Sequence, residues 1–173
     1  GHGNYEHTLL HALAWHFSEK SRVESQESRV ESEKVIDIND PSIGLVHRID
    51  KDTSGLLIVA KNDKAHLSLS EQIKDKTCGR TYYALLDGVL KSDSGTVDTF
   101  IGRSPKDRKM MAVLDDGKRA ISHYKVLQRY ENNCLVEFKL ETGRTHQIRV
   151  HSKHLVHPIV GDKTYGYKNQ KFN

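Results

Sequence analysis

The chain has 173 residues, of which 36% are hydrophobic and 29% charged, as expected of a globular protein with a hydrated surface and one hydrophobic core. Its net charge of +4 and pI of about 9.0 favour a polyanionic partner such as nucleic acid. The longest apolar run, 56–60 (LLIVA), is too short to cross a membrane, and the first residues do not form a signal peptide. Two cysteines without CxxC spacing indicate a reducing compartment. We therefore expect a cytoplasmic protein without a membrane partner.

The first segment combines a predicted helix with a polar stretch. Over residues 5–17 the apolar side chains recur at helical spacing, which predicts an amphipathic helix. The following residues contain RVES twice, seven residues apart. Residues 17–40 also hold four basic and seven acidic side chains, so the positive charge lies in the rest of the chain. We interpret 18–40 as a polar, low-complexity insertion, with a short partner-binding helix as the alternative.

From Ile43 onward the pattern is typical of a structured domain. A helix from Asn62, its N-cap, to about Asp75 is expected to turn its apolar face inward, and a second helix begins near Thr145. Mostly strands with few strand–helix–strand intervals predict an α+β fold, a central and largely antiparallel sheet flanked by helices and loops. The inward residues are Ala65, Leu69 and Ile73 in the first helix and Ile148, His151 and Leu155 in the second. The expected strands are 44–47, 56–61 (buried), 81–86, 98–101, 121–129 and 135–140.

The segment HRIDKDTSG, residues 47–55, is the first that points to chemistry. Asp50 and Asp52 lie two residues apart, between a short apolar run and the glycine that precedes LLIVA. A tight loop between strands can direct a carboxylate into a pocket. The same residue types also form charged hairpin turns, so the segment alone leaves both interpretations open.

A second segment, LETGRTHQIRVH, residues 140–151, gathers cationic and polar side chains where a helix is expected to begin. Gly143 permits a tight turn and Thr145 can cap the helix. Free N–H groups at a helix N-terminus, together with nearby cations, make a phosphate site. A basic, solvated helix face is the alternative. The side chains around this turn are Arg144, His146, Gln147, Arg149 and His151.

A third segment, HPIVGDKTYG, residues 157–166, has the proline and glycines of a shaped loop. Its Tyr165 is able either to stack on a base or to pack in the interior. We favour the packing role.

Two metal-dependent alternatives are weaker. Asp50–Thr53 (DKDT) matches DxDxT, the nucleophile loop of haloacid dehalogenase-type phosphatases, with Asp115 and Asp116 as an acidic pair. His47 and Arg48 stand where that loop requires an apolar parallel strand, and the chain lacks a doubly wound pattern. The C-terminal histidines are spaced by five, three and three residues, unlike HExxH, and no suitable Cys or carboxylate completes a set. We expect no metal site.

Four segments in order resemble the RluA-type family of pseudouridine synthases, in particular its large-subunit ribosomal RNA subgroup (RluD-like). They are HRIDKDTSGLLIVAK, GRTYYALLDG, LETGRTHQIRVH and HPIVGDKTYG, and the similarity runs from about Gly44 to Gly166, more weakly over the first helix. The resemblance implies the pseudouridine synthase fold and a single catalytic domain over residues 1–173. The family's opening strand, lysine–proline loop, S4 domain and full C-terminal segment are missing, which suggests truncation at both ends.

The resemblance also implies roles for individual residues. Asp50 matches the essential aspartate of the HRxD motif, Tyr82 the tyrosine that lies against the flipped base, and Arg149 the arginine that pairs with the aspartate. Arg48 matches the arginine that enters the RNA stack. Asp52 matches no catalytic residue, and we expect it to shape the loop. The apolar neighbour of the base is Ile148, and the phosphates are expected near Arg144, His146 and Gln147.

The resulting prediction is an isomerase that converts uridine to pseudouridine in large-subunit ribosomal RNA, without metal or cofactor. The target base must leave its stack before it can react. An RNA-binding module that no longer catalyses is the alternative from another class. The sequence does not set the oligomeric state.

Overall fold

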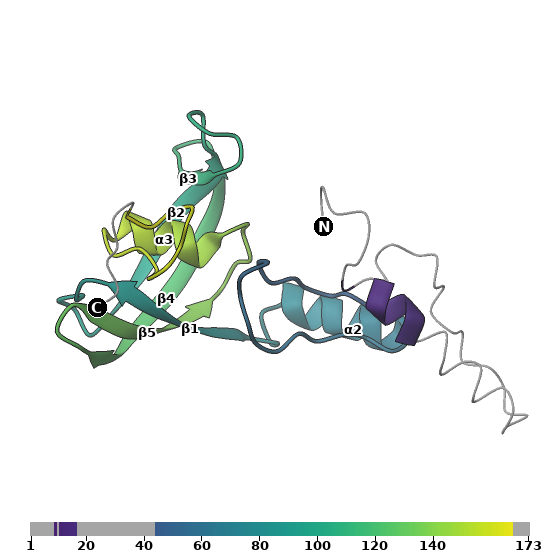
Figure 1. The fold of residues 1–173 in the computed structure, drawn as a ribbon. Coiled ribbons are helices and arrows are strands. Elements are labelled where there is room, and N and C mark those ends of the chain that lie inside the picture. Colours follow the sequence, from purple (N-terminus) through teal and green to yellow (C-terminus); the bar gives the residue numbers. More distant parts are fainter. Residues whose placement is uncertain (1–8, 10, 17–43, 168–173) are drawn as a thin grey trace, which may run out of the picture. The chain divides into compact units, whose positions relative to one another are not determined.

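The computed structural model describes residues 9, 11–16 and 44–167 (Figure 1). The chain forms two compact units, residues 1–78 and 79–173, which we describe separately. The single domain expected over 1–173 stays a prediction, and the insertion expected at 18–40 lies outside the described residues. Among the described residues, no helix is both long and apolar enough to pass through a membrane.

The first unit contains two helical segments. Residues 11–16 are helical, which confirms this part of the helix expected over 5–17. Helix α2 (Asp63–Lys74) begins at the predicted N-cap, where the Asn62 side chain accepts a hydrogen bond from the Ala65 N–H at 2.8 Å. The predicted inward face of α2 is its less exposed side, but no α2 residue is fully buried. Within the described residues, α2 thus has a side-chain cap at its start and an apolar side that is only partly buried.

The buried strand predicted at 56–61 is wrong. Leu56 is 96% exposed and Ile58 40%. Within the described residues, the only strand pairing of the 56–61 segment is an isolated bridge between Val59 and Leu45. The bridge requires glycine at position 44, because its φ is +63° and a Cβ there would lie 2.4 Å from the Ala60 carbonyl oxygen. An apolar run of this length forms a buried strand only where neighbouring strands cover it. No strand of the described part does so here.

The second unit is built on a five-stranded sheet in the order β1-β5-β4-β2-β3, in which every neighbouring pair is antiparallel (Figure 1). This confirms the predicted α+β class with an antiparallel sheet. The four strands expected beyond residue 80 are present and are longer than predicted, whereas the short β3 was not predicted. The strands are β1 (Arg80–Asp87), β2 (Ser94–Arg103), β3 (Met111–Val113), β4 (Lys118–Arg129) and β5 (Asn133–Leu140).

Alternation along the strands gives the sheet one covered face. In β5 every second side chain, Cys134, Val136 and Phe138, is fully buried, as expected of a strand with one face toward a core. In β4 the alternation fails near its end because a bulge between Val126 and Gln128 shifts the register against β5. The imperfect apolar pattern of residues 121–129 thus reflects an extra residue in the strand.

Helix α3 (Gln147–His154) lies against the sheet and contacts β2, β3 and β4 (Figure 1). Its predicted inward residue His151 is fully buried. The predicted cap is wrong: the helix starts two residues after Thr145, and His146 occupies the N-cap position with a left-handed φ of 56° and no capping side-chain bond. The side chain of Gln147, the first residue of the helix, instead bonds the turn before it and accepts from the Arg144 N–H at 2.9 Å.

Candidate active site

Asp50 lies on a turn in the first unit. Its carbonyl accepts a hydrogen bond from the Thr53 N–H at 3.0 Å, and its side chain is half-buried, whereas Arg48 and Asp52 are exposed. The loop is closed by His47, whose Nε2 accepts from the Ile58 N–H at 2.9 Å. The turn predicted for this segment is therefore present, and it carries the aspartate on a short, side-chain-braced loop.

Tyr82 and Ile148 pack against the same core in the second unit. Tyr82 stands opposite Phe138 on the neighbouring strand, and Ile148 comes from α3. Both side chains are half-buried and contact the cluster built around the fully buried Leu86, Val136 and Phe138. The structure thus brings together two residues for which the resemblance implies contact with one base.

Arg149 is clamped by Asp162, a residue that the sequence analysis did not single out. Its Nε and a terminal nitrogen donate to the two carboxylate oxygens at 2.7 and 2.9 Å, a bidentate pair in which the Asp162 side chain is 4% exposed and Arg149 20%. The guanidinium carbon also lies 4.8 Å from the centre of the Tyr165 ring. Arg149 is therefore fixed from two sides, and Asp162 is a positioning residue for it.

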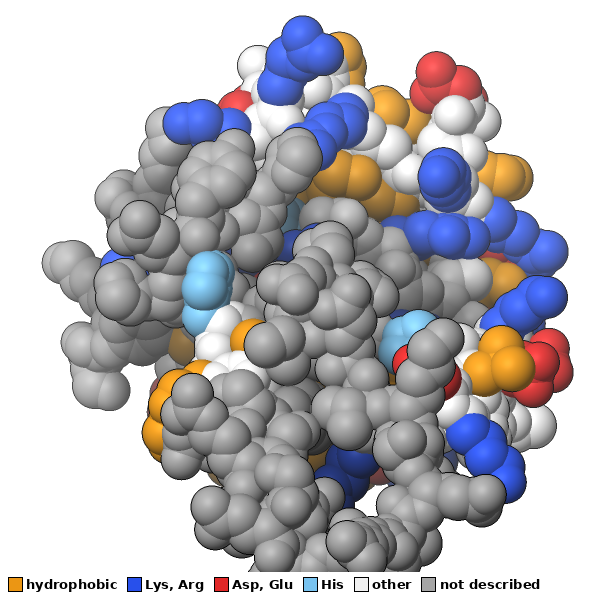
Figure 2. Space-filling model, turned by 90° about the vertical axis from the view of Figure 1, so that its right-hand side faces the viewer, with side chains coloured by type: hydrophobic (Ala, Val, Ile, Leu, Met, Phe, Trp, Pro, Cys, Tyr) orange, Lys and Arg blue, Asp and Glu red, His pale blue; other side chains and the backbone are white. Residues whose placement is uncertain are grey.

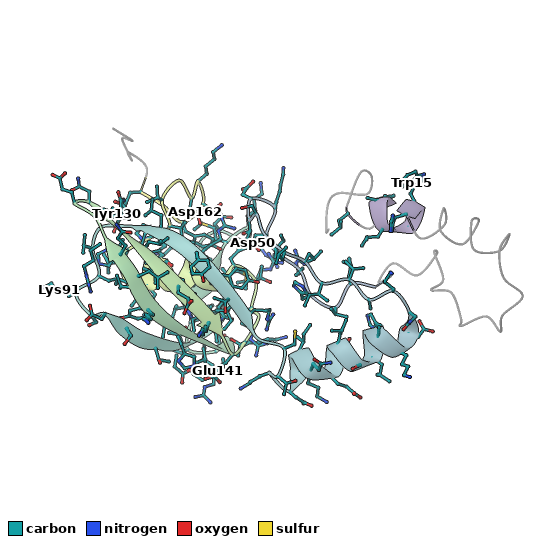
Figure 3. The ribbon with its side chains drawn as sticks, turned by 90° about the horizontal axis from the view of Figure 1, so that it is seen from below. Trp15, Asp50, Lys91, Tyr130, Glu141 and Asp162 are labelled. Carbon is teal, nitrogen blue, oxygen red and sulfur yellow. The ribbon has the colours of Figure 1, made fainter. Side chains whose placement is uncertain are left out.

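The loop after α3 makes several hydrogen bonds to Asp162, which is labelled in Figure 3. Oδ1 of Asp162 also accepts from the backbone N–H groups of Thr164 and Tyr165, at 2.8 and 3.0 Å. Gly166 closes the turn on the Asp162 carbonyl, where a Cβ would approach that oxygen to 2.4 Å. Burial raises the pKa of Asp162, but the bonds from Arg149 and from the two N–H groups outweigh it and hold the pKa below its usual value. Asp162 is therefore an anion at neutral pH.

The Asp162 pair uses two of the five N–H donors of the Arg149 guanidinium. Pairing of Arg149 with Asp50, which belongs to the other unit, stays a prediction.

Gln147 has a structural position. Its amide oxygen accepts from the Thr142 hydroxyl at 2.7 Å and from the Arg144 N–H at 2.9 Å. Its amide nitrogen donates to the Ile121 carbonyl and the Ser122 hydroxyl, both at 2.9 Å. The side chain is 3% exposed and all four of its hydrogen-bonding positions are used within the protein. The geometry favours a role in holding the turn before α3 over the predicted RNA contact.

The other two residues predicted near the phosphates differ in access. The Nδ1 of the half-buried His146 lies 2.8 Å from the Tyr165 hydroxyl, which also accepts from the Met111 N–H. Arg144 is exposed and uses its Nε to bind the Arg119 carbonyl at 2.9 Å. Tyr165 itself is 2% exposed, so the structural role favoured for it is confirmed. Of this group, Arg144 offers the most accessible cation.

The structure gives no support to the phosphatase alternative. Its sheet is antiparallel, whereas that class needs a parallel, doubly wound sheet. Asp115 and Asp116 lie in the exposed turn between β3 and β4. Across the described residues, no three His, Cys, Asp or Glu side chains gather in a way that could hold a metal ion.

Comparison with known proteins gives a consistent result. The family model for RNA pseudouridylate synthase matches residues 11–154. The chain is 57% identical over 123 residues to the uncharacterized RNA pseudouridine synthase YlyB of Bacillus subtilis, covering 71% of this chain and 41% of that protein. It is 44% identical over 164 residues to ribosomal large subunit pseudouridine synthase D of Pseudomonas aeruginosa, covering 95% and 46%. The chain thus spans less than half the length of both relatives.

A solved structure agrees. Human RNA pseudouridylate synthase domain containing 1 superposes with a TM-score of 0.68 at 32% identity, covering 76% of this chain and 58% of that one. The region that the family model matches, residues 11–154, includes the Asp50 loop, the sheet and α3, which carry the predicted site residues. The chain belongs to the RNA pseudouridylate synthase family, within its RluD-like branch.

Proposed function

We propose that this chain carries the catalytic part of an enzyme that isomerises uridine to pseudouridine in ribosomal RNA. The observation that carries the proposal is the Arg149 clamp: an arginine held by a buried carboxylate and an aromatic ring, next to Ile148 on the core that also holds Tyr82. Relatives named for large-subunit ribosomal RNA support the substrate class.

Asp50 is the proposed catalytic group. The reaction breaks the bond between N1 of uracil and C1′ of the ribose, turns the base, and joins C5 to C1′. C5 then loses a proton and N1 gains one, so the product has the same atoms and oxidation level as the substrate, and the chemistry needs no redox cofactor. An ionised aspartate can act here as a nucleophile or as a proton acceptor. Arg149 beside it would keep the carboxylate charged.

The remaining residues serve base extrusion and RNA binding. Removing a base from its stack costs a few kcal/mol. Exposed Arg48 is proposed to fill the gap and stack on neighbouring bases, while Tyr82 and Ile148 contact the flipped base. Exposed Arg144 and the partly buried His146 would lie near the phosphates. The free thiols of Cys78 and Cys134 suit the proposed cytoplasmic location.

A direct test uses two aspartates of the same loop. The chain is incubated with unmodified ribosomal RNA, and pseudouridine is mapped chemically for the parent, Asp50→Asn and Asp52→Asn. We expect product from the parent and from Asp52→Asn at one or a few sites, and none from Asp50→Asn. Asp52 is the matched control because it is an exposed carboxylate two residues away.

Other outcomes favour other functions. RNA binding by all three proteins without any pseudouridine would favour the non-catalytic RNA-binding module. Magnesium-dependent hydrolysis of a simple phosphate ester, lost in Asp50→Asn, would favour the phosphatase.

A further inference from the structure

The last residue of β2 and the loop that follows it, residues 103–109 (RSPKDRK), concentrate positive charge. It holds four basic residues and one acidic residue, and from Pro105 to Lys109 every residue is exposed. At the top of Figure 2, the level that this loop has in Figure 1, Lys and Arg side chains lie at the surface. We call residues 103–109 the basic arm.

Three cations of the basic arm lack the acidic partner that three arginines elsewhere in the described part of the unit have. Arg119, Arg129 and Arg149 are each paired with an aspartate, at 2.6 to 2.7 Å. In contrast, no described residue accepts a hydrogen bond or forms an ion pair with the side chains of Lys106, Arg108 and Lys109. These three charges are therefore available to an anion from outside the unit.

Internal hydrogen bonds hold the arm in one shape. Arg103 donates to the Arg108 carbonyl at 2.7 Å, and the Ser104 hydroxyl accepts from two backbone N–H groups at 3.2 and 3.3 Å. The single acid, Asp107, accepts from the Lys109 N–H at 2.9 Å with its side chain, and its carbonyl accepts from the Met110 N–H at 2.9 Å. The loop thus uses its one carboxylate for its own turn, and a partner would not have to order the backbone.

The base of the arm contacts Tyr165, the residue whose ring lies against Arg149. The N–H of Met111, the first residue of β3, donates to the Tyr165 hydroxyl at 2.8 Å. Met110 and Met111 pack against the core cluster that contains Val150 of α3 and Tyr165. Because the same Tyr165 ring lies against Arg149, one aromatic side chain fixes the position of the arm relative to Arg149.

We propose that the basic arm grips the phosphate backbone of the substrate RNA next to the modified uridine, through Lys106, Arg108 and Lys109. This inference rests on the proposed function and adds to it a phosphate-binding surface outside the Asp50 loop and the turn before α3. Such contacts are independent of base sequence. The arm therefore sets affinity and orientation, and the choice of uridine is left to the residues proposed to contact the base.

The test replaces all three side chains in the 173-residue chain with glutamine. Binding to an unmodified ribosomal RNA fragment is followed by fluorescence anisotropy at several salt concentrations, and pseudouridine is measured on the same samples. Each lost phosphate contact lowers the slope of log affinity against log salt by about 0.7 to 0.9. We expect the slope to fall by about 2 and the affinity to fall at least about tenfold near 0.1 M salt.

The control variant removes the same charge elsewhere, by replacing Lys91, Lys125 and Lys139 with glutamine. These side chains are exposed, with Lys125 and Lys139 on the outer face of the sheet. Lys91, labelled in Figure 3, lies just before β2, whereas the arm begins at the other end of that strand. Their loss should change the slope by less than about half as much. Circular dichroism checks that both variants are folded. If the triple arm variant does not fold, the double variant Lys106→Gln/Lys109→Gln replaces it.

The outcomes separate the two proposals. If the arm variant and the control variant have equal slopes while the parent forms pseudouridine, the arm proposal is wrong and the proposed function stands. If the arm variant loses affinity but the parent forms no pseudouridine, the arm binds RNA and the proposed function fails.

Discussion

Asp50 and Arg149, the two residues proposed to act together, are held in opposite ways within their own units. Asp50 lies on a loop whose neighbours are exposed or half-buried, next to an apolar run that includes a 96% exposed leucine. Arg149 lies on a helix packed against a sheet, with a carboxylate and an aromatic ring that fix its guanidinium. The proposed reacting group thus lies on a largely exposed loop, whereas the arginine proposed to orient it lies on a packed helix. Substitutions should therefore separate activity from stability in the first unit and couple them in the second.

The largest expected effect is on activity alone. Asp50→Asn should lower pseudouridine formation at least about a thousandfold, because a neutral amide is neither a nucleophile nor a proton acceptor for this reaction. The free energy of unfolding should change by less than about 1 kcal/mol, since Asp50 is only half-buried. Single-turnover kinetics and urea unfolding measure the two quantities. A large loss of stability would mean that the loop is a structural element and would break the comparison.

Asp162→Asn should change both quantities. It leaves the mostly buried Arg149 without its carboxylate, which is expected to cost about 3 kcal/mol of unfolding free energy. The rate constant kcat should fall more than KM rises, because Arg149 loses its orientation and not the RNA contacts. Asp162→Glu, which keeps the charge, should restore part of the rate.

Asp98→Asn is the matched control for that substitution. It breaks a similar bidentate arginine–aspartate pair, with Arg119, on the exposed face of the sheet. Solvent screens this pair, so the loss of stability should be much smaller. Equal losses in both variants would contradict the view that burial makes the Arg149 clamp important.

A third effect depends on pH. Burial lowers the pKa of His151 to about 4, with smaller contributions from His154, which lowers it, and Asp98, which raises it. In the unfolded chain His151 takes up a proton below about pH 6.5. In the folded chain the same side chain stays neutral until about pH 4. Stability is therefore lost as the pH falls from 6.5 to 4, by about 2 kcal/mol between pH 7 and pH 5. Urea unfolding of the parent and of His151→Gln at both pH values measures this, and identical pH dependences would refute it.

The smallest effect belongs to Leu56→Ser. A leucine that is 96% exposed contributes little to burial, so the free energy of unfolding should change by less than about 0.5 kcal/mol. Leu86→Ala, in the fully buried core of the second unit, should cost about 2 to 5 kcal/mol in the same assay. A cost at Leu56 close to that at Leu86 would show that 56–61 is covered after all.

Much of this fold could be predicted because strand alternation and helix capping depend on residues that are close together in the sequence. The alternation of apolar residues predicts the four long strands, and Asn62 begins α2 as expected. The run 56–61 was misread because burial depends on neighbouring strands, which the run itself does not encode. Strand β3 was missed because three residues at a sheet edge carry too little periodicity.

The site was predicted only in part. Tyr82, Ile148 and Arg149 follow from motifs, and the structure places Tyr82 and Ile148 on one core. Asp162 was missed because in the sequence it is an ordinary loop residue between Gly161 and Lys163. Its role arises from a contact with a helix thirteen residues earlier, which spacing cannot show.

The segment after α3 also protects the sheet from other chains. At one edge, the backbone of residues 158–160 pairs with the end of β1 through two hydrogen bonds, from the Asp87 N–H to the Pro158 carbonyl and from the Val160 N–H to the Leu85 carbonyl. At the other edge, the outward-pointing N–H of Met111 in β3 donates a hydrogen bond to the Tyr165 hydroxyl. Open strand edges are templates for strand addition by a neighbouring molecule. One short segment thus blunts both ends of the sheet, and a chain that lost it would be prone to assemble into aggregates through its bare edges.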